Sequence, residues 1–178
     1  MKKLLTLLAL SLFALGLSAQ ETGCHFVQNT TRRGVTVFQD GILFFAEPDL
    51  LRLNYLHPKG DYLIVDETML RSRFNGQASD IDTEKDFRAR AFRNALVYGY
   101  TGKYEDLAKE MNADVSVKEE KGVKTVTLTP KTPVSRGISA VEASYDAQGR
   151  ATRLVITRSG DRRLASSTPV TEEYLFDY

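Results

Sequence analysis

The amino-acid sequence predicts an α+β fold: an open, strongly curved antiparallel β-sheet, in effect an incomplete barrel, with helices inserted mid-chain as a lid over an apolar cavity. Three observations predict it. Short runs of alternating apolar and polar residues recur along most of the chain. The period changes to that of a helix only between residues 87 and 111, and no long linker or internal repeat divides the 178 residues. We therefore expect about ten strands and two helices in one domain.

The first 19 residues have the pattern of a secretory signal. Lys2 and Lys3 precede an apolar run over residues 4–17, and the small residues Ser18 and Ala19 follow it. The run is shorter than the ~20 residues that a membrane-spanning helix needs. We expect cleavage after Ala19, export to the periplasm, and a single folded domain over residues 20–178.

Cys24 allows a second interpretation of this end of the chain, lipid attachment to an N-terminal cysteine. Glu21 stands where such a signal carries an aliphatic residue. We therefore prefer an unpaired thiol at the start of the first strand. Because Cys24 is the only cysteine, a disulfide framework is excluded.

Alternation with a period of two predicts five strands before residue 75. In the clearest of them, Leu51, Leu53 and Tyr55 occupy every second position. The polar stretch Asn75–Thr83, rich in Gly, Asp and Ser, predicts a loop. The expected strands are Cys24–Thr31, Val35–Ala46, residues 50–55, Tyr62–Asp66 and Met69–Phe74.

The middle of the chain has helical spacing. Asp82 or Thr83 is the expected N-cap of the first helix. The apolar positions of this helix are Phe87, Ala91, Phe92, Ala95 and Leu96, and those of a second, shorter helix are Tyr104, Leu107, Ala108 and Met111.

Strands resume after the helices, and the expected ranges are Asp114–Lys118, Val123–Thr129, Ile138–Tyr145, Thr152–Arg158 and Val170–Phe176. A sheet of about ten strands twists and curls. Helices of roughly 15 and 10 residues span only about 22 and 15 Å. They cannot cover such a sheet if it is flat, but they fit the mouth of a curved one. A concave face that is only partly filled leaves an apolar hollow, which suits apolar ligands.

Composition and motifs exclude several classes of function. The 24 Lys and Arg against 23 Asp and Glu leave no basic excess for a nucleic-acid partner. Two histidines and one cysteine are too few for most metal sites. The chain has no nucleophile elbow, phosphate-binding loop or H-E-x-x-H motif. We expect no catalytic residues, no metal and no cofactor.

Two weaker patterns could indicate a hydrolytic site and a calcium site. His57, Asp61 and Ser72 are the components of a hydrolytic triad, but their spacing does not support one. An acidic alternation resembles a calcium loop but lacks its glycine and terminal glutamate, so a solvated loop is the better interpretation. Its members are Asp80, Asp82, Glu84 and Asp86.

Arginines and aromatic residues gather on and around the first helix. Arg88, Arg90 and Arg93 are the elements of an anionic head-group site, although a solvated helix face is the preferred interpretation. Core packing accounts for most of the aromatic residues, and we expect some of them to line the hollow between sheet and helices.

The order and spacing of several motifs resemble the outer-membrane lipoprotein carrier family, the LolA-like proteins. The resemblance spans roughly residues 26–158. It rests on Phe26-Val27-Gln28, on the run from Gly41 to Tyr55 with Pro48 and Arg52, on Pro58 and Tyr62–Val65, and on Leu128-Thr129-Pro130-Lys131.

This resemblance implies an open barrel with a helical lid over an apolar cavity. It also implies a non-enzymatic carrier that takes acylated lipoproteins from an inner-membrane release complex to an outer-membrane receptor. We expect a monomer with lipoprotein or lipid as its partner. The motif positions place Leu43, Phe45, Leu51, Leu53 and Tyr55 on the cavity side of adjacent strands. Phe92 and Leu96 of the first helix complete the expected ligand-binding set.

The sequence departs from the family pattern at two places. Glu47 occupies the position before Pro48 where relatives carry an arginine that latches the lid helices, so that latch cannot form here. Only Gln20–Gly23 stand between the signal and Cys24, where relatives have a helix. Both departures favour a second hypothesis, a carrier adapted to another amphiphile such as a glycolipid or a fatty acyl intermediate. A secreted hydrolase and an interaction module with a filled concave face are further alternatives.

Overall fold

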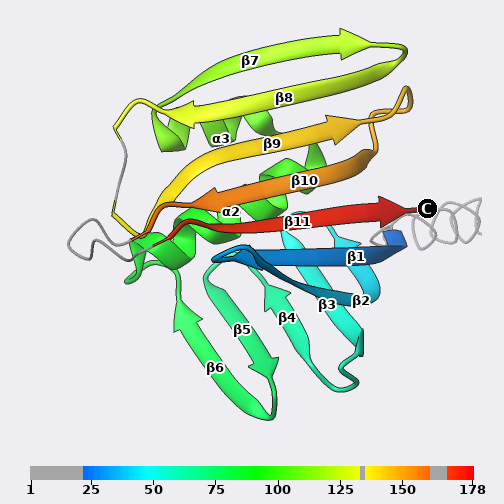
Figure 1. Cartoon of the computed structure of the whole chain (residues 1–178), viewed down its shortest axis with the longest axis vertical. Helices are drawn as coiled ribbons and strands as arrows, with labels where there is room; N and C mark the ends of the chain where they lie inside the picture. Colours follow the sequence, from blue (N-terminus) through cyan, green and yellow to red (C-terminus); the bar gives the residue numbers. More distant parts are fainter. Residues whose placement is uncertain (1–21, 133–134, 161–167) are drawn as a thin grey trace, which may run out of the picture.

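The computed structural model describes residues 22–132, 135–160 and 168–178, and within them eleven strands form one antiparallel sheet (Figure 1). The predicted signal, residues 1–19, lies outside the described residues. In order across the sheet the strands are β6 (Gln77–Asp82), β5 (Met69–Phe74), β4 (Tyr62–Val65), β3 (Leu50–His57), β2 (Val35–Ala46), β1 (Thr22–Arg32), β11 (Val170–Asp177), β10 (Ala151–Arg158), β9 (Ile138–Tyr145), β8 (Val123–Pro130) and β7 (Ala113–Glu120).

The sheet is curved and unclosed, as the sequence predicts. β6 and β7 are its two edges, and α2 (Phe87–Thr101) and α3 (Tyr104–Met111) lie between them in the chain. Figure 1 shows both helices against one face of the sheet, behind β8–β11 in this view. Neither helix in the described part of the chain is long and apolar enough to cross a bilayer.

The predicted loop over Asn75–Thr83 is wrong, because Gln77–Asp82 forms β6 and pairs with β5. The turn between them is Asn75-Gly76, with φ angles of 51° and 79°. An Asn-Gly pair with two positive φ angles is a strong signal for a two-residue hairpin. The residues of β6 show no alternation of apolar and polar side chains, because the strand lies at the exposed edge of the sheet and does not need an apolar face.

The N-cap of α2 also differs from the prediction. Asp86, rather than Asp82 or Thr83, caps the helix: its carboxylate accepts from the backbone N–H groups of Arg88 at 2.8 Å and Ala89 at 3.1 Å. Asp82 instead ends β6, where it pairs with Met69. The helix therefore begins later than expected, directly over the concave face of the sheet.

Irregular pairing and one glycine account for the tight curvature of the sheet around β2. The register between β2 and β3 shifts at Asp40 and Gly41, and such a bulge bends a strand. A Cβ atom on Gly41 would overlap the carbonyl oxygen of Asn54 and lie 2.7 Å from the Phe26 ring. Gly41 therefore allows the backbone and the aromatic ring to come this close.

A second glycine brings α2 down onto the sheet. A Cβ atom on Gly99 would lie 2.6 Å from a methyl carbon of Leu154 on β10. The Tyr145 hydroxyl of β9 donates to the Gly99 carbonyl at 2.8 Å. The middle and C-terminal part of the helix is thus in direct contact with the sheet.

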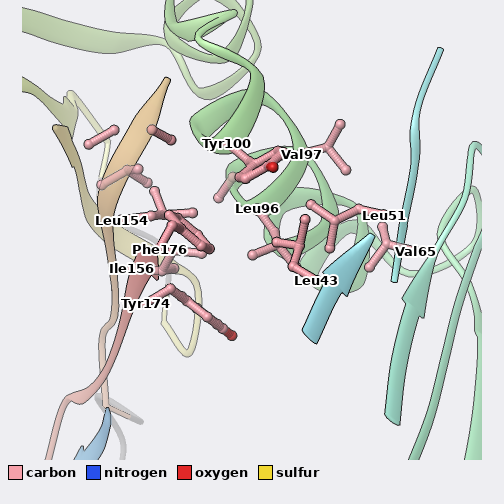
Figure 2. Close-up of a cluster of buried hydrophobic side chains, with 14 of the residues drawn as sticks. Leu43, Leu51, Val65, Leu96, Val97, Tyr100, Leu154, Ile156, Tyr174 and Phe176 are labelled. Carbon is pink, nitrogen blue, oxygen red and sulfur yellow. The ribbon is translucent and has the colours of Figure 1, made fainter. Parts of the chain in front are cut away.

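The core fills the space beneath that part of α2. Side chains of α2 lie between inward-facing residues from the two halves of the sheet (Figure 2). The helix contributes Leu96, Val97 and Tyr100; β2, β3 and β4 contribute Leu43, Leu51 and Val65; β10 and β11 contribute Leu154, Ile156, Tyr174 and Phe176.

Candidate functional site

A pocket of about 590 Å³ lies between the first two turns of α2 and the concave face of the sheet, and it opens to solvent. Asp86, Arg88, Ala89 and Phe92 form its helical wall. The rest of the lining comes from nine strands and from the segment before β9: Gln28, Thr30, Gln39, Tyr55, Leu63, Leu70, Ser72, Phe74, Ile81, Arg136, Gly137, Ile138, Arg158, Glu172 and Tyr174.

Polarity divides this pocket across the sheet. The strands β3–β6 contribute an apolar side, Tyr55, Leu63, Leu70, Phe74 and Ile81, with Ser72 as its polar exception. The strands β1, β2, β10 and β11 contribute a polar side: Gln28, Thr30, Gln39, Arg158, Glu172 and Tyr174. A pocket with one apolar side and one hydrogen-bonding side suits an amphiphilic ligand better than a purely apolar one.

A chain of hydrogen bonds runs along the floor of the pocket across four strands. The Tyr55 hydroxyl donates to Gln28 Oε1 at 2.5 Å, and Gln28 Nε2 donates to the Tyr174 oxygen at 3.2 Å. The Tyr174 hydroxyl donates to Glu172 Oε2 at 3.1 Å. Arg158 donates from Nη2 to the other oxygen of Glu172. Each link supplies the partner of the next, so the two tyrosine hydroxyls, the Gln28 amide and the Glu172 carboxylate are all paired with protein groups.

Burial fixes the two tyrosines of this chain as hydroxyl donors. Removal from solvent, reinforced by the nearby Glu172 carboxylate, raises the pKa of Tyr174 well above its ordinary value. Burial and the same carboxylate also raise the pKa of Tyr55. Both hydroxyls therefore keep their protons at any physiological pH, and the direction of the hydrogen-bond chain is constant.

Arg158 stands at the polar end of the chain. Its guanidinium lies over the Phe92 ring of α2, 5.4 Å from the ring centroid, which joins helix and sheet at the pocket. Its Nε atom is buried and has no hydrogen-bond partner within the described residues. An unsatisfied buried donor of this kind is uncommon in folded proteins.

The predicted ligand-binding residues divide between this pocket and the core. Tyr55 and Phe92 line the pocket. Leu43, Leu51, Leu53 and Leu96 are fully buried, and Phe45 is nearly so; all five belong to the core. Phe45 also lines a second pocket, of about 560 Å³, at the opposite end of α2 beside Pro48 and Tyr100. Contact of these residues with a ligand stays a prediction.

Gln28, Arg158 and Glu172 are pocket residues that sequence reasoning missed. Gln28 shares its strand parity with the buried Cys24 and Phe26, so a polar side chain at an inward-facing position was a usable signal. The same signal was present on β10 and β11. Arg158 shares its strand parity with the buried Ile156, and Glu172 shares its parity with the buried Tyr174.

Arg93 is not on a solvated helix face, contrary to the sequence interpretation. It is buried, and it donates from Nη2 to Asp49 Oδ2 at 2.9 Å and from Nε to the Asp66 carbonyl oxygen at 3.1 Å. Asp49 lies in the turn between β2 and β3, and Asp66 in the turn between β4 and β5. α2 is therefore tied to two turns of the sheet.

The tie extends to α3. Arg93 Nη1 donates to Asn94 Oδ1 at 2.8 Å, and Asn94 in turn donates to Glu110 of α3. Lys103 Nζ, in the loop between the helices, lies 3.8 Å from Asp49 Oδ1. The helices are thus held to the β2–β3 turn from their own side, by Arg93 and Lys103.

The residues of the alternative catalytic interpretation do not come together. His57 Nδ1 lies 2.8 Å from Asp40 Oδ1, and the Asp61 carboxylate accepts from the Asn75 backbone N–H at 3.1 Å. Ser72 lines the pocket without either of them. Across residues 22–132, 135–160 and 168–178, no three His, Cys, Asp or Glu side chains gather as metal ligands.

Cys24 is a buried free thiol. Its Sγ atom lies 4.0 Å from the Tyr100 hydroxyl oxygen, beneath the end of α2. Burial raises the pKa of this thiol. In this position Cys24 is a small core residue.

Comparison with known proteins gives a family and several distant structures. The family model described as "Outer membrane lipoprotein carrier protein LolA" matches residues 18–165. No curated protein matches the chain.

Three solved structures illustrate the structural likeness. A LolA superfamily protein from Nitrosomonas europaea is 8% identical, with 91% of this chain and 86% of that chain covered and a TM-score of 0.36. A putative outer membrane lipoprotein-sorting protein domain from Vibrio parahaemolyticus is 8% identical, with 96% and 88% covered and a TM-score of 0.38. The lipoprotein LppX of Mycobacterium tuberculosis is 16% identical, with 99% and 94% covered and a TM-score of 0.32.

Proposed function

The chain belongs to the outer membrane lipoprotein carrier protein family, LolA, and from this premise we propose that it is a periplasmic carrier for the acyl chains of lipoproteins. In this proposal it receives its cargo from an inner-membrane release complex and delivers it to an outer-membrane receptor. It acts as a monomer and catalyses no reaction. The observation that carries the proposal is the amphipathic pocket under the first turns of α2.

The energetics of acyl chains explain what such a carrier needs. Each methylene removed from water contributes about 0.8 kcal/mol, so a 16-carbon chain gains on the order of 12 kcal/mol. A membrane offers nearly the same gain. The carrier must therefore bind a chain slightly better than its donor does and slightly worse than its acceptor. A pocket that enlarges and closes with a movable helix can provide this adjustment.

Movement of α2 would expose the predicted site. Tyr55 and Phe92 already line the pocket, so they contact the first part of a chain. Leu43, Phe45, Leu51, Leu53 and Leu96 are covered in the present state. Lifting α2 away from the sheet would open these apolar side chains to further chain length, and it requires that Arg93 release Asp49.

The mouth of the pocket has an apolar extension that is suited to contact with a membrane or a receptor. Thr30 and Gln39 of the β1–β2 hairpin line the pocket. Val37 shares a face of β2 with Gln39 and is 55% exposed, and its neighbour Phe38 is 71% exposed. β3 pairs with β2 only from Asp40 onward, so nothing in the sheet covers this tip on that side. We place the exchange of cargo here.

Native mass spectrometry of the protein purified from its own periplasm tests the proposal. We expect a fraction that carries lipoprotein, and we expect the purified protein to remove a fluorescently labelled lipoprotein from inner-membrane vesicles. Absence of any bound lipoprotein or lipid, together with no uptake of a fluorescent acyl probe, would contradict it.

A second candidate is a carrier of the same fold for another amphiphile, such as a glycolipid or a fatty acyl intermediate. The polar side of the pocket, with Arg158 and Glu172, favours it. Depletion of the protein then affects one lipid, whereas loss of a lipoprotein carrier affects lipoproteins in general.

A further inference from the structure

We propose that the pocket binds a single acyl chain whose anionic head group, a carboxylate or a phosphate, lies against the guanidinium groups of Arg158 and Arg88. This inference rests on the acyl-binding pocket of the proposed function and deepens its second candidate, a carrier of another amphiphile, because it names the chemical class of that ligand.

The size of the pocket sets the number of chains. A volume of about 590 Å³ equals roughly 20 water-sized volumes of ~30 Å³ each, and a methylene group is about as large as a water molecule. One chain of roughly 20 carbons, or one of roughly 16–18 carbons together with its head group, therefore fills the pocket. The three chains of a triacylated anchor do not fit while α2 stays in place.

The distribution of polarity sets the direction in which the chain lies. The apolar wall formed by β3–β6 and Phe92 receives the chain, and the head group then lies at the opposite wall, formed by β1, β10 and β11. Arg158 is on that wall, and Arg136 lies on the same side just before β9. Arg88 approaches from the first turn of α2.

The charge of the head group follows from a count of donors and acceptors. Both carboxylates of the lining are already used within the protein: Asp86 accepts two backbone N–H groups of α2, and Glu172 accepts from Arg158 and Tyr174. A guanidinium has five N–H donors, and among the described residues the Glu172 carboxylate engages only the Nη2 of Arg158. The Nε of Arg158 has no partner in the described part of the protein.

Arg88 adds further unused donors. Its guanidinium lies over the adjacent Phe87 ring, 5.2 Å from the ring centroid, and this cation–π contact leaves its N–H groups able to donate. The pocket therefore has more N–H donors from its arginines than its two carboxylates can accept. Such a site favours a ligand that supplies hydrogen-bond acceptors and negative charge. Arg88 is exposed, as the interpretation of a solvated helix face expects, and it also lines the pocket; that interpretation is wrong for Arg93, which is buried.

Equilibrium binding of matched single-chain probes to the purified protein tests the inference. Palmitate and hexadecyl phosphate carry the anionic groups, and hexadecanol and hexadecyltrimethylammonium serve as the neutral and cationic analogues of the same length. Each displaces a neutral fluorescent acyl probe. We expect the anionic probes to bind at least 10-fold more tightly than hexadecanol, and the cationic probe to bind most weakly.

Two variants assign the preference to the pocket. Arg158→Gln and Arg88→Gln should each reduce the ratio between palmitate and hexadecanol by 3- to 10-fold. The matched control is Arg153→Gln, since Arg153 lies on the same strand, pairs with Glu142 and Glu173, and is outside the pocket. If Arg158→Gln fails to fold, Arg88→Gln and the salt dependence of the ratio carry the test.

Two further comparisons test whether the anion must belong to an amphiphile and whether the pocket takes one acyl chain or three. Inorganic phosphate should displace the probe only at concentrations far above those of hexadecyl phosphate. Displacement by inorganic phosphate as efficient as by the amphiphile overturns the inference, as does equal affinity for palmitate and hexadecanol. Tighter binding of a synthetic triacylated lipopeptide than of palmitate also overturns it but leaves the proposed function intact. Failure of every acyl probe to bind contradicts the proposed function itself.

Discussion

Nη2 of Arg93, on α2, donates to Oδ2 of Asp49, in the turn between β2 and β3, over 2.9 Å. The arginine side chain is only 7% exposed and the aspartate 22%, so little solvent screens the pair. The residue before Pro48 in the same turn is Glu47. An arginine from the helix and a carboxylate from the turn therefore hold the helices to this turn.

Replacement of Asp49 should loosen this tie. Asp49→Ala leaves the buried Arg93 charge without its carboxylate partner, and we expect a loss of about 2–3 kcal/mol in the free energy of unfolding, less than for a fully buried pair because Asp49 is partly exposed. Urea denaturation measures the loss. Lys85→Ala is the control, since Lys85 pairs with Asp82 at 2.6 Å but is 84% exposed. Equal effects of the two substitutions would show that the Arg93 pair has no special role.

Close contact between α2 and β10 gives a second prediction. Gly99→Ala puts a Cβ atom 2.6 Å from Leu154, and overpacking of this kind costs about 1–3 kcal/mol. Leu154→Ala alone should cost about 2–5 kcal/mol by leaving a cavity. In the double variant the cavity accommodates the new methyl group, so the combined loss should be smaller than the sum. Strict additivity of the two losses would contradict the proposed contact.

The hydrogen-bond chain on the pocket floor predicts the effect of one missing hydroxyl. Tyr55→Phe leaves Gln28 Oε1 without the donor that lies 2.5 Å away, and an unsatisfied buried acceptor costs about 1–3 kcal/mol. Thermal unfolding measures the loss. Tyr62→Phe, in the adjacent strand β4, should change stability by less than about 0.5 kcal/mol. A loss for Tyr55→Phe no larger than that of this control would exclude a structural role for the chain.

Acid should weaken the turn that receives Arg93. Partial burial acts to raise the pKa of Asp66, but the N–H groups of Met69 and Thr68 and the Arg71 guanidinium outweigh it and lower this pKa below the ordinary 3.8. Since the folded-state pKa is the lower one, the stabilisation is complete above pH ~4 and is lost as the pH falls through the folded pKa. Asp66→Asn should flatten the decline of the urea midpoint between pH 5 and pH 2. An unchanged slope would be evidence against this carboxylate as a source of acid sensitivity.

The exposed hairpin at the pocket mouth predicts a kinetic effect. Val37→Thr should slow the transfer of a fluorescent acyl chain from the protein to vesicles several-fold, and it should leave the affinity for the chain unchanged. Val117→Thr is a matched control, because Val117 is a strand residue of similar exposure, 52% against 55%, on the distant edge strand β7. Equal transfer rates for the two variants would remove the hairpin from the exchange step.

Local sequence patterns predict most of this fold. Alternation identifies ten of the strands, and nine of them bury the apolar residues of their inward faces in the core. The tenth, β7, is an exposed edge strand that keeps the alternation, with Val115 and Val117 at every second position. β6 has no such alternation, and its evidence is the Asn75-Gly76 turn alone. The N-cap at Asp86 was missed because Asp82, Thr83 and Asp86 are all acceptable caps, and the pairing of Asp82 with Met69 decides between them.

The pocket is less predictable than the fold. Tyr55 and Phe92 come from recognisable apolar patterns, but the polar wall combines Gln28, Arg158 and Glu172, which are far apart in the chain. They meet because β1, β11 and β10 are neighbours in the sheet, and local periodicity does not reveal strand order. Arg93 was assigned to a solvated face for a related reason, since its partners Asp49 and Asp66 belong to distant turns.

Binding of a fluorescent 16-carbon acyl probe to the purified protein and to Ala89→Phe tests the central claim most directly. Ala89 is buried in the helical wall of the pocket, and a phenyl ring there should fill much of the space. Arg90→Phe is the control on the exposed side of the same turn. We predict saturable binding of one probe per protein that Ala89→Phe weakens at least 10-fold and Arg90→Phe does not. No binding to the natural sequence, or equal binding to all three proteins, would contradict an acyl-chain site under α2.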